Sequence, residues 1–272
     1  MRVRSVLLYL AVLPLLVGAA APIQLQPSSQ WDLDYGENSC RLIRLMGEGK
    51  QQTKLVFESV GPGDLTMLAI GAPLYSPKFE PAVTAKFVPA QSNELKGTSA
   101  VGASGHDAAA FWSNLGYTNT VDEDVIARSN AIQVNVEGGH PVVLATGDLG
   151  PAMQAFDKCT QDLLADFGLD PAVQAKIARP ASAPGLEQWL EGEVFFSGSQ
   201  QQERISEASF RLLVDATGHV TKCVSVSRFN VPEFDVALCT AIEKGAPIQP
   251  AQLADGTKVP SYVVEHIDFE LE

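Results

Sequence analysis

The residues of this 272-residue chain that could do chemistry are few, with only four histidines and four cysteines. Ser104, His106 and Asp107 together offer a hydroxyl, an imidazole and a carboxylate, the groups needed for nucleophilic catalysis. All three lie in one segment rich in glycine and alanine, whereas a catalytic triad is assembled from distant positions on a rigid frame. We therefore expect no catalytic residue and predict that the protein is not an enzyme.

Metal and nucleotide sites also lack their usual patterns. The histidines are scattered along the chain: His106, His140, His219 and His266. No two of them have the spacing of a metal-ligand pair, and the acidic run at residues 122–124 lacks the framework of a calcium loop. No glycine-rich nucleotide fingerprint occurs either. The sequence thus predicts no metal and no cofactor.

Some of these polar residues have structural interpretations. His140 follows two glycines and is expected in a turn, and His266 alternates with Glu265 on a strand face that we expect to point outward. The segment Asp215-Ala216-Thr217-Gly218 looks superficially like the Asp-Thr-Gly of aspartic proteases. Ala216 interrupts that motif, and the segment predicts a hairpin turn.

Charge and composition exclude further classes of function. The chain carries 32 acidic and 19 basic residues, a formal net charge of −13. Sequence-independent nucleic-acid binding and docking on anionic lipid both need an excess of lysine and arginine, so neither is expected. A hydrophobic content of 46% is typical of globular proteins, and the length indicates about two domains.

The first 21 residues have the organisation of a secretion signal. Arg2 and Arg4 form a positive start, residues 6–17 an apolar core, and residues 18–21 a small-residue stretch that signal peptidase accepts. The apolar part is about 16 residues long with Pro14 inside it, short of the roughly 20 residues that cross a bilayer. We expect residues 1–21 to be a cleaved signal peptide, with no stable membrane insertion afterwards. The alternative is an uncleaved inner-membrane anchor.

Export changes the interpretation of the cysteines, because disulfides form and persist in oxidising compartments. Cys40, Cys159, Cys223 and Cys239 allow three pairings, and none is spaced as a CxxC motif. The two-domain organisation described next favours Cys40 with Cys159 and Cys223 with Cys239, one bond in each domain. The alternative is four buried free thiols.

The first domain, residues 30–168, is predicted to be rich in β-strands and closed by a helix. Strand-like runs separated by glycine turns occupy residues 31–35, 40–45, 54–59, 65–70, 83–88, 132–136 and 142–145. Residues 89–110 are expected to form a long surface loop. A helix is predicted from Pro151, because Ala152, Phe156, Cys159 and Leu163 make one apolar stripe. A linker is then expected over residues 171–188.

The second domain, residues 189–272, is predicted to have strand-strand-helix-strand order. Strands at 210–214 and 220–226 flank the turn at Asp215, and a helix begins near residues 230–233. This helix presents Phe234, Leu238, Ala241 and Ile242 on one side and ends at Gly245. A last strand is expected at 261–271. The predicted fold class of the chain is α+β, a β-rich domain followed by a small ββαβ domain.

Several short patterns of the second domain occur in a fixed order: Asp215-x-x-Gly218-His219-Val220, Cys223, Pro232-x-Phe234-Asp235-x-Ala237, Pro250-Ala251 and Asp255-Gly256. In this order the segment resembles the carboxy-terminal domain of the TonB family. The resemblance covers about residues 189–272 and implies binding of a partner by β-strand addition at a sheet edge. The candidate edge is the last strand, with Tyr262, Val264, His266 and Asp268. The implied partner is an envelope protein or an outer-membrane receptor peptide.

Other parts of the chain differ from a TonB energy transducer, which has an anchored helix with a functional histidine and a long proline-rich spacer. No histidine precedes His106 here, and no long proline-rich spacer occurs. We therefore expect a non-enzymatic periplasmic protein that reuses a TonB-like domain for binding. One alternative is a divergent transducer for outer-membrane transport with an uncleaved anchor. A further alternative is a cell-envelope hydrolase.

Overall fold

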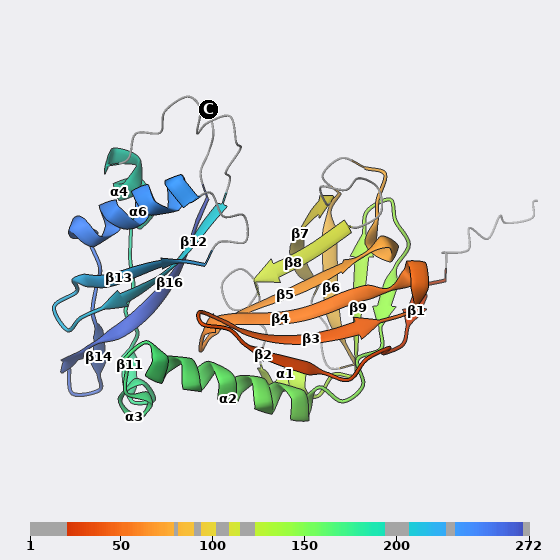
Figure 1. The fold of residues 1–272 in the computed structure, drawn as a ribbon, viewed down its shortest axis with the longest axis horizontal. Coiled ribbons are helices and arrows are strands. Elements are labelled where there is room, and N and C mark those ends of the chain that lie inside the picture. The colour runs from red at the N-terminus through yellow and green to blue at the C-terminus, as the bar shows by residue number, and fades with distance from the viewer. Residues whose placement is uncertain are drawn as a thin grey trace, which may run out of the picture.

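A computed structural model of the protein describes residues 21–78, 81–89, 94–101, 109–114, 123–193, 207–226 and 232–268. The predicted signal segment up to residue 20 lies outside these ranges, as do Ser104, His106, Asp107 and Asp122. The fold is α+β, as predicted, with most of the regular structure in strands. Figure 1 shows the β-rich amino-terminal part and the smaller carboxy-terminal part, with one long helix running between them.

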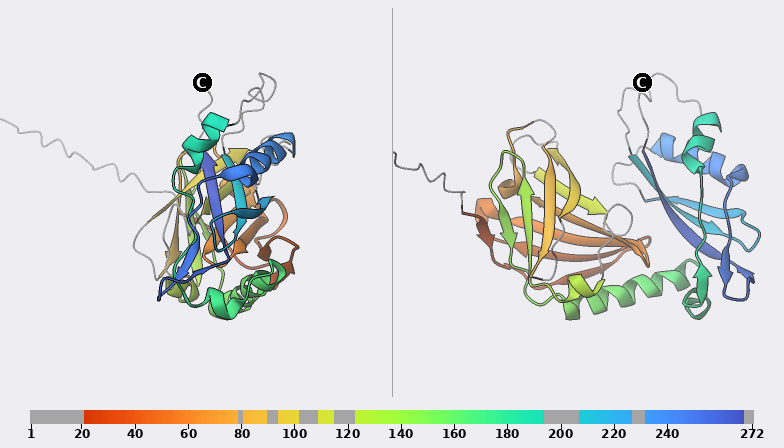
Figure 2. Two further views of the ribbon diagram at one scale, coloured as in Figure 1. Left: turned by 90° about the vertical axis from the view of Figure 1, so that its left-hand side faces the viewer. Right: turned by 180° about the vertical axis from the view of Figure 1, so that it is seen from behind.

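The first domain is built on one ten-stranded sheet in the order β1-β10-β9-β6-β7-β8-β5-β4-β3-β2. Its strands are β1 Ile23–Leu25, β2 Asp32–Tyr35, β3 Cys40–Met46, β4 Thr53–Gly61, β5 Asp64–Gly71, β6 Val83–Val88, β7 Leu95–Val101, β8 Ala109–Asn114, β9 Ala131–Val136 and β10 Val142–Leu144. The sheet curls on itself, because the chain after β1 meets the end of β3 through backbone bonds from Ser28 to Leu45 and from Gly47 to Gln26. Figure 2 shows the resulting barrel-like shape.

Residues 89–110 differ from the sequence-based expectation of one long loop. Within them, β7 and the start of β8 are strands, and β7 pairs with both β6 and β8 in the sheet. The local composition is rich in glycine, serine and alanine, which have weak strand preference. The open sides of β6 and β5 supply the backbone partners that this composition does not signal. The loop prediction was therefore wrong for residues 95–101 and 109–110, and residues 90–93 and 102–108 lie outside the described residues.

Helix α2, Gly150–Asp166, packs along β3 and β4 and closes the first domain. Its buried residues include Phe156, Cys159 and Leu163, so the predicted apolar stripe faces the core. Gly168 follows the helix with φ of +76°, a conformation that glycine adopts without strain. Two short helices, α1 Glu123–Ala127 and α3 Pro171–Gln174, flank α2 in the chain.

The second domain has its own hydrophobic core. A three-stranded antiparallel sheet in the order β13-β12-β16 is covered on one face by α6 Pro232–Gly245 and α4 Leu186–Glu193. Its strands are β12 Glu207–Val214, β13 Val220–Ser225 and β16 Ser261–Asp268. The core contains Phe210, Leu212, Phe234, Leu238 and Ile242. This strand-strand-helix-strand order matches the predicted ββαβ arrangement.

The segment predicted as a linker, residues 171–188, contains regular structure. After α3, β11 Ile177–Arg179 pairs with β14 Ala251–Leu253, which in turn pairs with β15 Lys258–Val259. Ala183 and Leu186 then join the core of the second domain. Much of this segment therefore belongs to the second domain, which begins earlier in the chain than residue 189.

Both disulfides have the pairing that the sequence favours. Cys40 on β3 is bonded to Cys159 on α2, and Cys223 on β13 is bonded to Cys239 on α6. Two disulfides are typical of an oxidising extracytoplasmic compartment. Among the residues described, no helix is long and apolar enough to cross a membrane.

Candidate functional site

The candidate edge strand β16 lies at the edge of its sheet, and β12 is its neighbour there. The direction of its backbone groups follows from the ladder on the other side of β12. The N–H of Val226 donates to the carbonyl of Ser209 at 2.8 Å, so the odd-numbered residues of β12 direct their backbone groups toward β13. The even-numbered residues of β12 therefore direct their backbone groups toward β16. The β16 residues opposite them, such as Val263, are odd-numbered and direct their own backbone groups toward β12.

The backbone N–H and C=O groups of Tyr262, Val264 and His266 consequently point away from β12, to the outer side of the sheet. Pro260 is also even-numbered, and its carbonyl accepts a bond from the Gln174 side chain at 2.9 Å and not from β12, which supports this assignment. No described strand pairs with that side of β16. The backbone of Asp268 continues the strand opposite Glu207.

Two hollows follow this outer side of β16. The first has a volume of about 590 Å³. It is lined by four consecutive β16 residues, 261–264, and by His266. Its other wall comes from the β4–β5 turn, from α2 and from residues 171–181. Because consecutive strand residues line it, the hollow follows the edge of the sheet and not one face alone.

The second hollow continues along the end of the strand. It is lined by residues 265–267 of β16 and by residues 182–188 before and within α4. The Glu265 carboxylate accepts a bond from the N–H of Ala183, so this side chain bridges the strand and the opposite wall. Burial raises the pKa of Glu265. Figure 2 shows the chain between β11 and α4 running beside β16.

The side chains of the even-numbered β16 residues face the first domain. The Tyr262 hydroxyl donates to the carbonyl of Pro62 at 2.6 Å, and a Cβ on Gly61 would lie only 2.7 Å from the Tyr262 ring. Burial, together with the nearby Asp64, raises the pKa of Tyr262, so the hydroxyl remains a donor. This contact fixes the β4–β5 turn against β16.

His266 is not on an outward face, contrary to the sequence-based expectation. Its side chain is 16% exposed and lies between the domains. Nδ1 is 2.8 Å from the Ser209 hydroxyl, and Nε2 is 3.1 Å from a carboxylate oxygen of Asp64. The alternation with Glu265 is real, but the first domain covers the face that the alternation alone would leave in solvent.

This arrangement brings a serine, a histidine and an aspartate together, a set that sequence reasoning did not find. Asp64 and His266 are 202 positions apart, so no local spacing signals the contact. Ser209 is 7% exposed and does not line the hollow, whereas Asp64 and His266 do. A nucleophile must reach the substrate, so this geometry supports a polar contact between the domains and not a catalytic triad.

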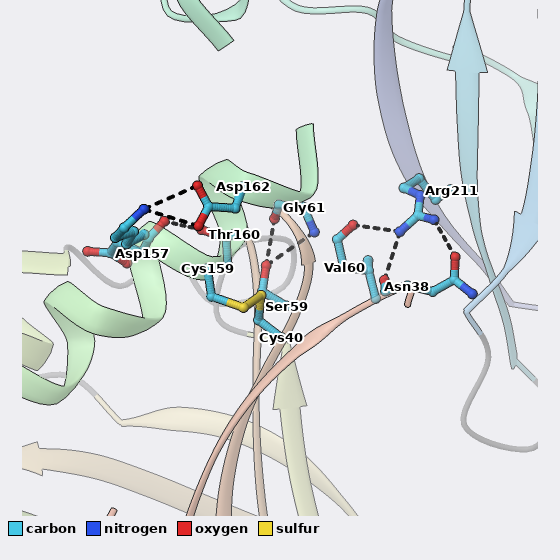
Figure 3. Close-up of a disulfide and its surroundings, with 11 residues drawn as sticks. Asn38, Cys40, Ser59, Val60, Gly61, Asp157, Cys159, Thr160, Asp162 and Arg211 are labelled. Atoms are coloured by element: carbon cyan, nitrogen blue, oxygen red, sulfur yellow. Dashed lines mark hydrogen bonds and ion pairs between the residues drawn. A yellow bond between two sulfur atoms is a disulfide. The ribbon is translucent and has the colours of Figure 1, made fainter. Parts of the chain in front are cut away.

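Arg211 is the most deeply buried cation of the interface between the domains. It extends from β12 and donates to the carbonyls of Asn38 and Val60, at 2.8 and 3.1 Å, and to the side-chain oxygen of Asn38 at 2.8 Å. Its guanidinium also lies 3.7 Å from the ring centre of Phe167, just after α2. Burial lowers the pKa of Arg211 to about 10. Figure 3 shows the bonds from Arg211 to Asn38 and Val60, together with the Cys40–Cys159 disulfide.

The other two histidines that the structure describes lie outside this site. His140 is exposed in the turn before β10, and His219 is exposed after the β12–β13 turn. Within the described ranges, no cluster of three or more histidine, cysteine or acidic residues could hold a metal ion. Comparisons with protein-family models, with curated proteins and with solved structures gave no match.

Proposed function

We propose that this protein is an exported, non-enzymatic binding protein of the periplasm that captures an extended peptide of a partner protein on β16. The observation that carries the proposal is the first hollow, which forms a groove along the outward backbone of Tyr262 and Val264. A peptide in this groove would add a fourth strand to the sheet and exchange main-chain hydrogen bonds with both residues.

The shape and chemistry of the groove support an extended occupant. Its walls include Leu164, Ile177, Pro180 and Val263, which offer apolar contacts to the side chains of a peptide. The edge supplies regularly spaced donors and acceptors, which match an extended backbone and not a helix. The resemblance of residues 189–272 to the TonB carboxy-terminal domain agrees with this mode of binding. An envelope protein or an outer-membrane receptor peptide is the partner class that it implies.

The two disulfides and the predicted signal at residues 1–21 support export, and the TonB resemblance supports the periplasm as the destination. Among the described residues, the hydroxyl beside His266 is that of Ser209, which is 7% exposed, so we favour binding over the hydrolase alternative. An energy transducer with an uncleaved anchor would need residues 1–21 to stay attached, which an intact mass of the protein from its own cells would reveal.

The proposal is tested with a blocked hexapeptide of alternating valine and threonine, a generic strand former. Calorimetry and amide hydrogen exchange are measured on the mature protein. We expect the peptide to slow exchange at the Tyr262 and Val264 amides and to leave β13 unchanged. Absence of protection at these amides, or protection at β13 instead, would overturn the proposal.

A matched pair of variants makes the test specific to the edge. Val264→Pro removes an N–H that points outward and spares the bonds to β12, a position where proline is tolerated in edge strands. Val264→Thr keeps this N–H and the β-branched shape. We expect the proline variant to lose peptide binding and the threonine variant to retain it, with both remaining folded by circular dichroism. Equal binding by the two variants would show that the edge is not the site.

A further inference from the structure

The first and second hollows together form the groove beside β16, and the polarity of its lining changes along its length. This change indicates which peptide the groove accepts. Beside residues 261–264 the opposite wall is mainly apolar, with Leu164, Ile177, Pro180 and Ala181. Beside residues 265–267 the second hollow carries the carboxylates of Glu265 and Glu187. The occupant of the groove therefore meets an apolar half and an acidic half.

Apart from His266, which lies against Asp64 and near Glu265, the charged side chains of the groove are carboxylates. Its carboxylates are Asp64 in the first hollow and Glu187 and Glu265 in the second. No lysine or arginine is among the described residues that line either hollow. Asp64 is already bonded to His266, whereas Glu187 in the second hollow is exposed. The formal net charge of −13 adds a long-range attraction for cations.

Desolvation of Glu265 gives a second reason to expect a cation there. Its carboxylate is partly buried, and burial raises its pKa more than the neutral backbone N–H of Ala183 and the nearby His266 lower it. A positive side chain in the hollow would compensate the cost of burying this charge, whereas an acidic side chain would increase that cost. Glu187 lies exposed on α4, where it can meet the same cation from the opposite wall.

The direction of the peptide follows from strand pairing. β16 pairs with β12 in the antiparallel sense, and antiparallel ladders are slightly more stable per residue than parallel ones. An antiparallel peptide places its amino-terminal half beside residues 265–267 and its carboxy-terminal half beside residues 261–264. The first half lies in the acidic hollow and the second half in the apolar hollow.

From these observations we infer that the partner segment is an extended peptide with basic residues in its amino-terminal half and apolar residues in its carboxy-terminal half, bound antiparallel to β16. This inference rests on the proposed function, because it specifies the chemistry of the same groove. The mature protein is tested with three blocked heptapeptides: Lys-Thr-Lys-Thr-Val-Thr-Val, the same sequence in reverse order, and the first sequence with glutamate in place of lysine.

We expect the first peptide to bind at least tenfold more tightly than the glutamate peptide at low salt, and several-fold more tightly than the reversed peptide. The advantage over the glutamate peptide should shrink as salt is raised, because screening weakens exposed charge pairs. Equal affinities for the lysine and glutamate peptides would overturn the charge assignment. Tighter binding of the reversed peptide would overturn the antiparallel direction.

Two variants test whether Glu187 and Glu265 cause the preference for the lysine peptide. Glu187→Gln and Glu265→Gln should each reduce the ratio of lysine-peptide to glutamate-peptide affinity several-fold, and glutamine at 265 keeps an acceptor for Ala183. Glu48→Gln, an exposed site in the first domain, removes the same charge away from the groove and should leave the ratio unchanged. An unchanged ratio in both groove variants would contradict the inference.

Hydrogen exchange at the Tyr262 and Val264 amides distinguishes a failure of the inferred peptide chemistry from a failure of edge binding. If the lysine and glutamate peptides protect these amides equally, edge binding stands and the inferred peptide chemistry is wrong. If no peptide protects them, the proposed function fails and the inference fails with it.

Discussion

The two domains contrast in how far along the chain their disulfides reach. Cys40 and Cys159 are 119 residues apart and join the early strand β3 to the closing helix α2. Cys223 and Cys239 are 16 residues apart and join β13 to the helix that covers it. The first bond therefore constrains a whole domain, whereas the second constrains one strand and one helix.

The two domains also differ in the length and charge of the edge strands β2 and β16. In the first domain the edge strand β2 has four residues, and exposed Asp32 and Asp34 lie on it, with Asp34 3.6 Å from Arg41. Short, charged edges discourage pairing with other chains. In the second domain β16 has eight residues and an apolar groove beside it. The short, charged edge at β2 thus differs from the longer edge at β16 with a groove beside it, and the proposed binding function requires an edge of the second kind.

The largest expected effect is on the long-range disulfide. Replacing Cys40 and Cys159 together by serine should destabilise the first domain by about 5 kcal/mol, since a bond closing a long loop removes much entropy from the unfolded chain. Both cysteines are buried in the main core of this domain, so two serines there add a further cost. Denaturant unfolding followed at the tryptophans measures the loss. A loss no greater than that of the second pair would contradict the loop-length argument.

The local disulfide should matter less. Replacing Cys223 and Cys239 by serine removes about 3 kcal/mol in the same model, because the closed loop is short. Both residues are only partly buried against their core. The second domain should melt earlier while the Cys40–Cys159 bond stays intact, which mass spectrometry after alkylation can verify. An unchanged melting curve would rule out a stabilising role for this bond.

The next largest expected effect is the loss of the Arg211 contact between the domains. Arg211→Met keeps an apolar contact with Phe167 and leaves the carbonyls of Asn38 and Val60 without this donor, a loss of about 2 kcal/mol. Limited proteolysis of residues 171–188 and small-angle scattering should then report domains that separate more readily. Arg41→Met is the matched control: Arg41 forms exposed ion pairs, so stability should change by less than about 0.5 kcal/mol. Similar behaviour of both variants would show that Arg211 does not hold the domains together.

Sequence patterns predicted those helices and turns whose formation depends on neighbouring residues in the chain. The stripe through Phe156, Cys159 and Leu163 identified α2 and its buried face, because 3.6-residue periodicity is a property of the segment itself. The turn at Asp215 was predictable for the same kind of reason, since Gly218 has φ of +95° and Asp215 accepts bonds from its neighbours.

The contacts between the domains could not be predicted in this way. Arg211 meets Val60 across 151 positions, and Tyr262 meets Pro62 across 200. Nothing in the alternation of β16 shows that one face is covered by another domain. The edge itself was predictable as a strand, but its groove depends on residues from the β4–β5 turn and from α2.

The smallest expected effect separates two aspartates of the second domain by the sign of their pH dependence. Burial raises the pKa of Asp235, a helix residue that accepts a bond from Ser225, above its usual value of 3.8. The folded state then holds this proton more tightly than the unfolded state, so stability falls as pH rises through this range. Bonds from Thr217 and His219 lower the pKa of Asp215, so its contribution is present above pH 3.8 and is lost as pH falls through its folded-state pKa.

Melting temperatures between about pH 3 and pH 7 for Asp235→Asn and Asp215→Asn, each compared with the unmodified protein, test both signs at once. Relative to the unmodified protein, the Asp235 variant should gain stability with rising pH and the Asp215 variant should lose it. Asparagine preserves an acceptor oxygen at both positions, so each slope reports the charge and not the loss of a hydrogen bond. If the Asp235 variant instead lost stability with rising pH, the bond from Ser225 would outweigh the desolvation of the Asp235 carboxylate.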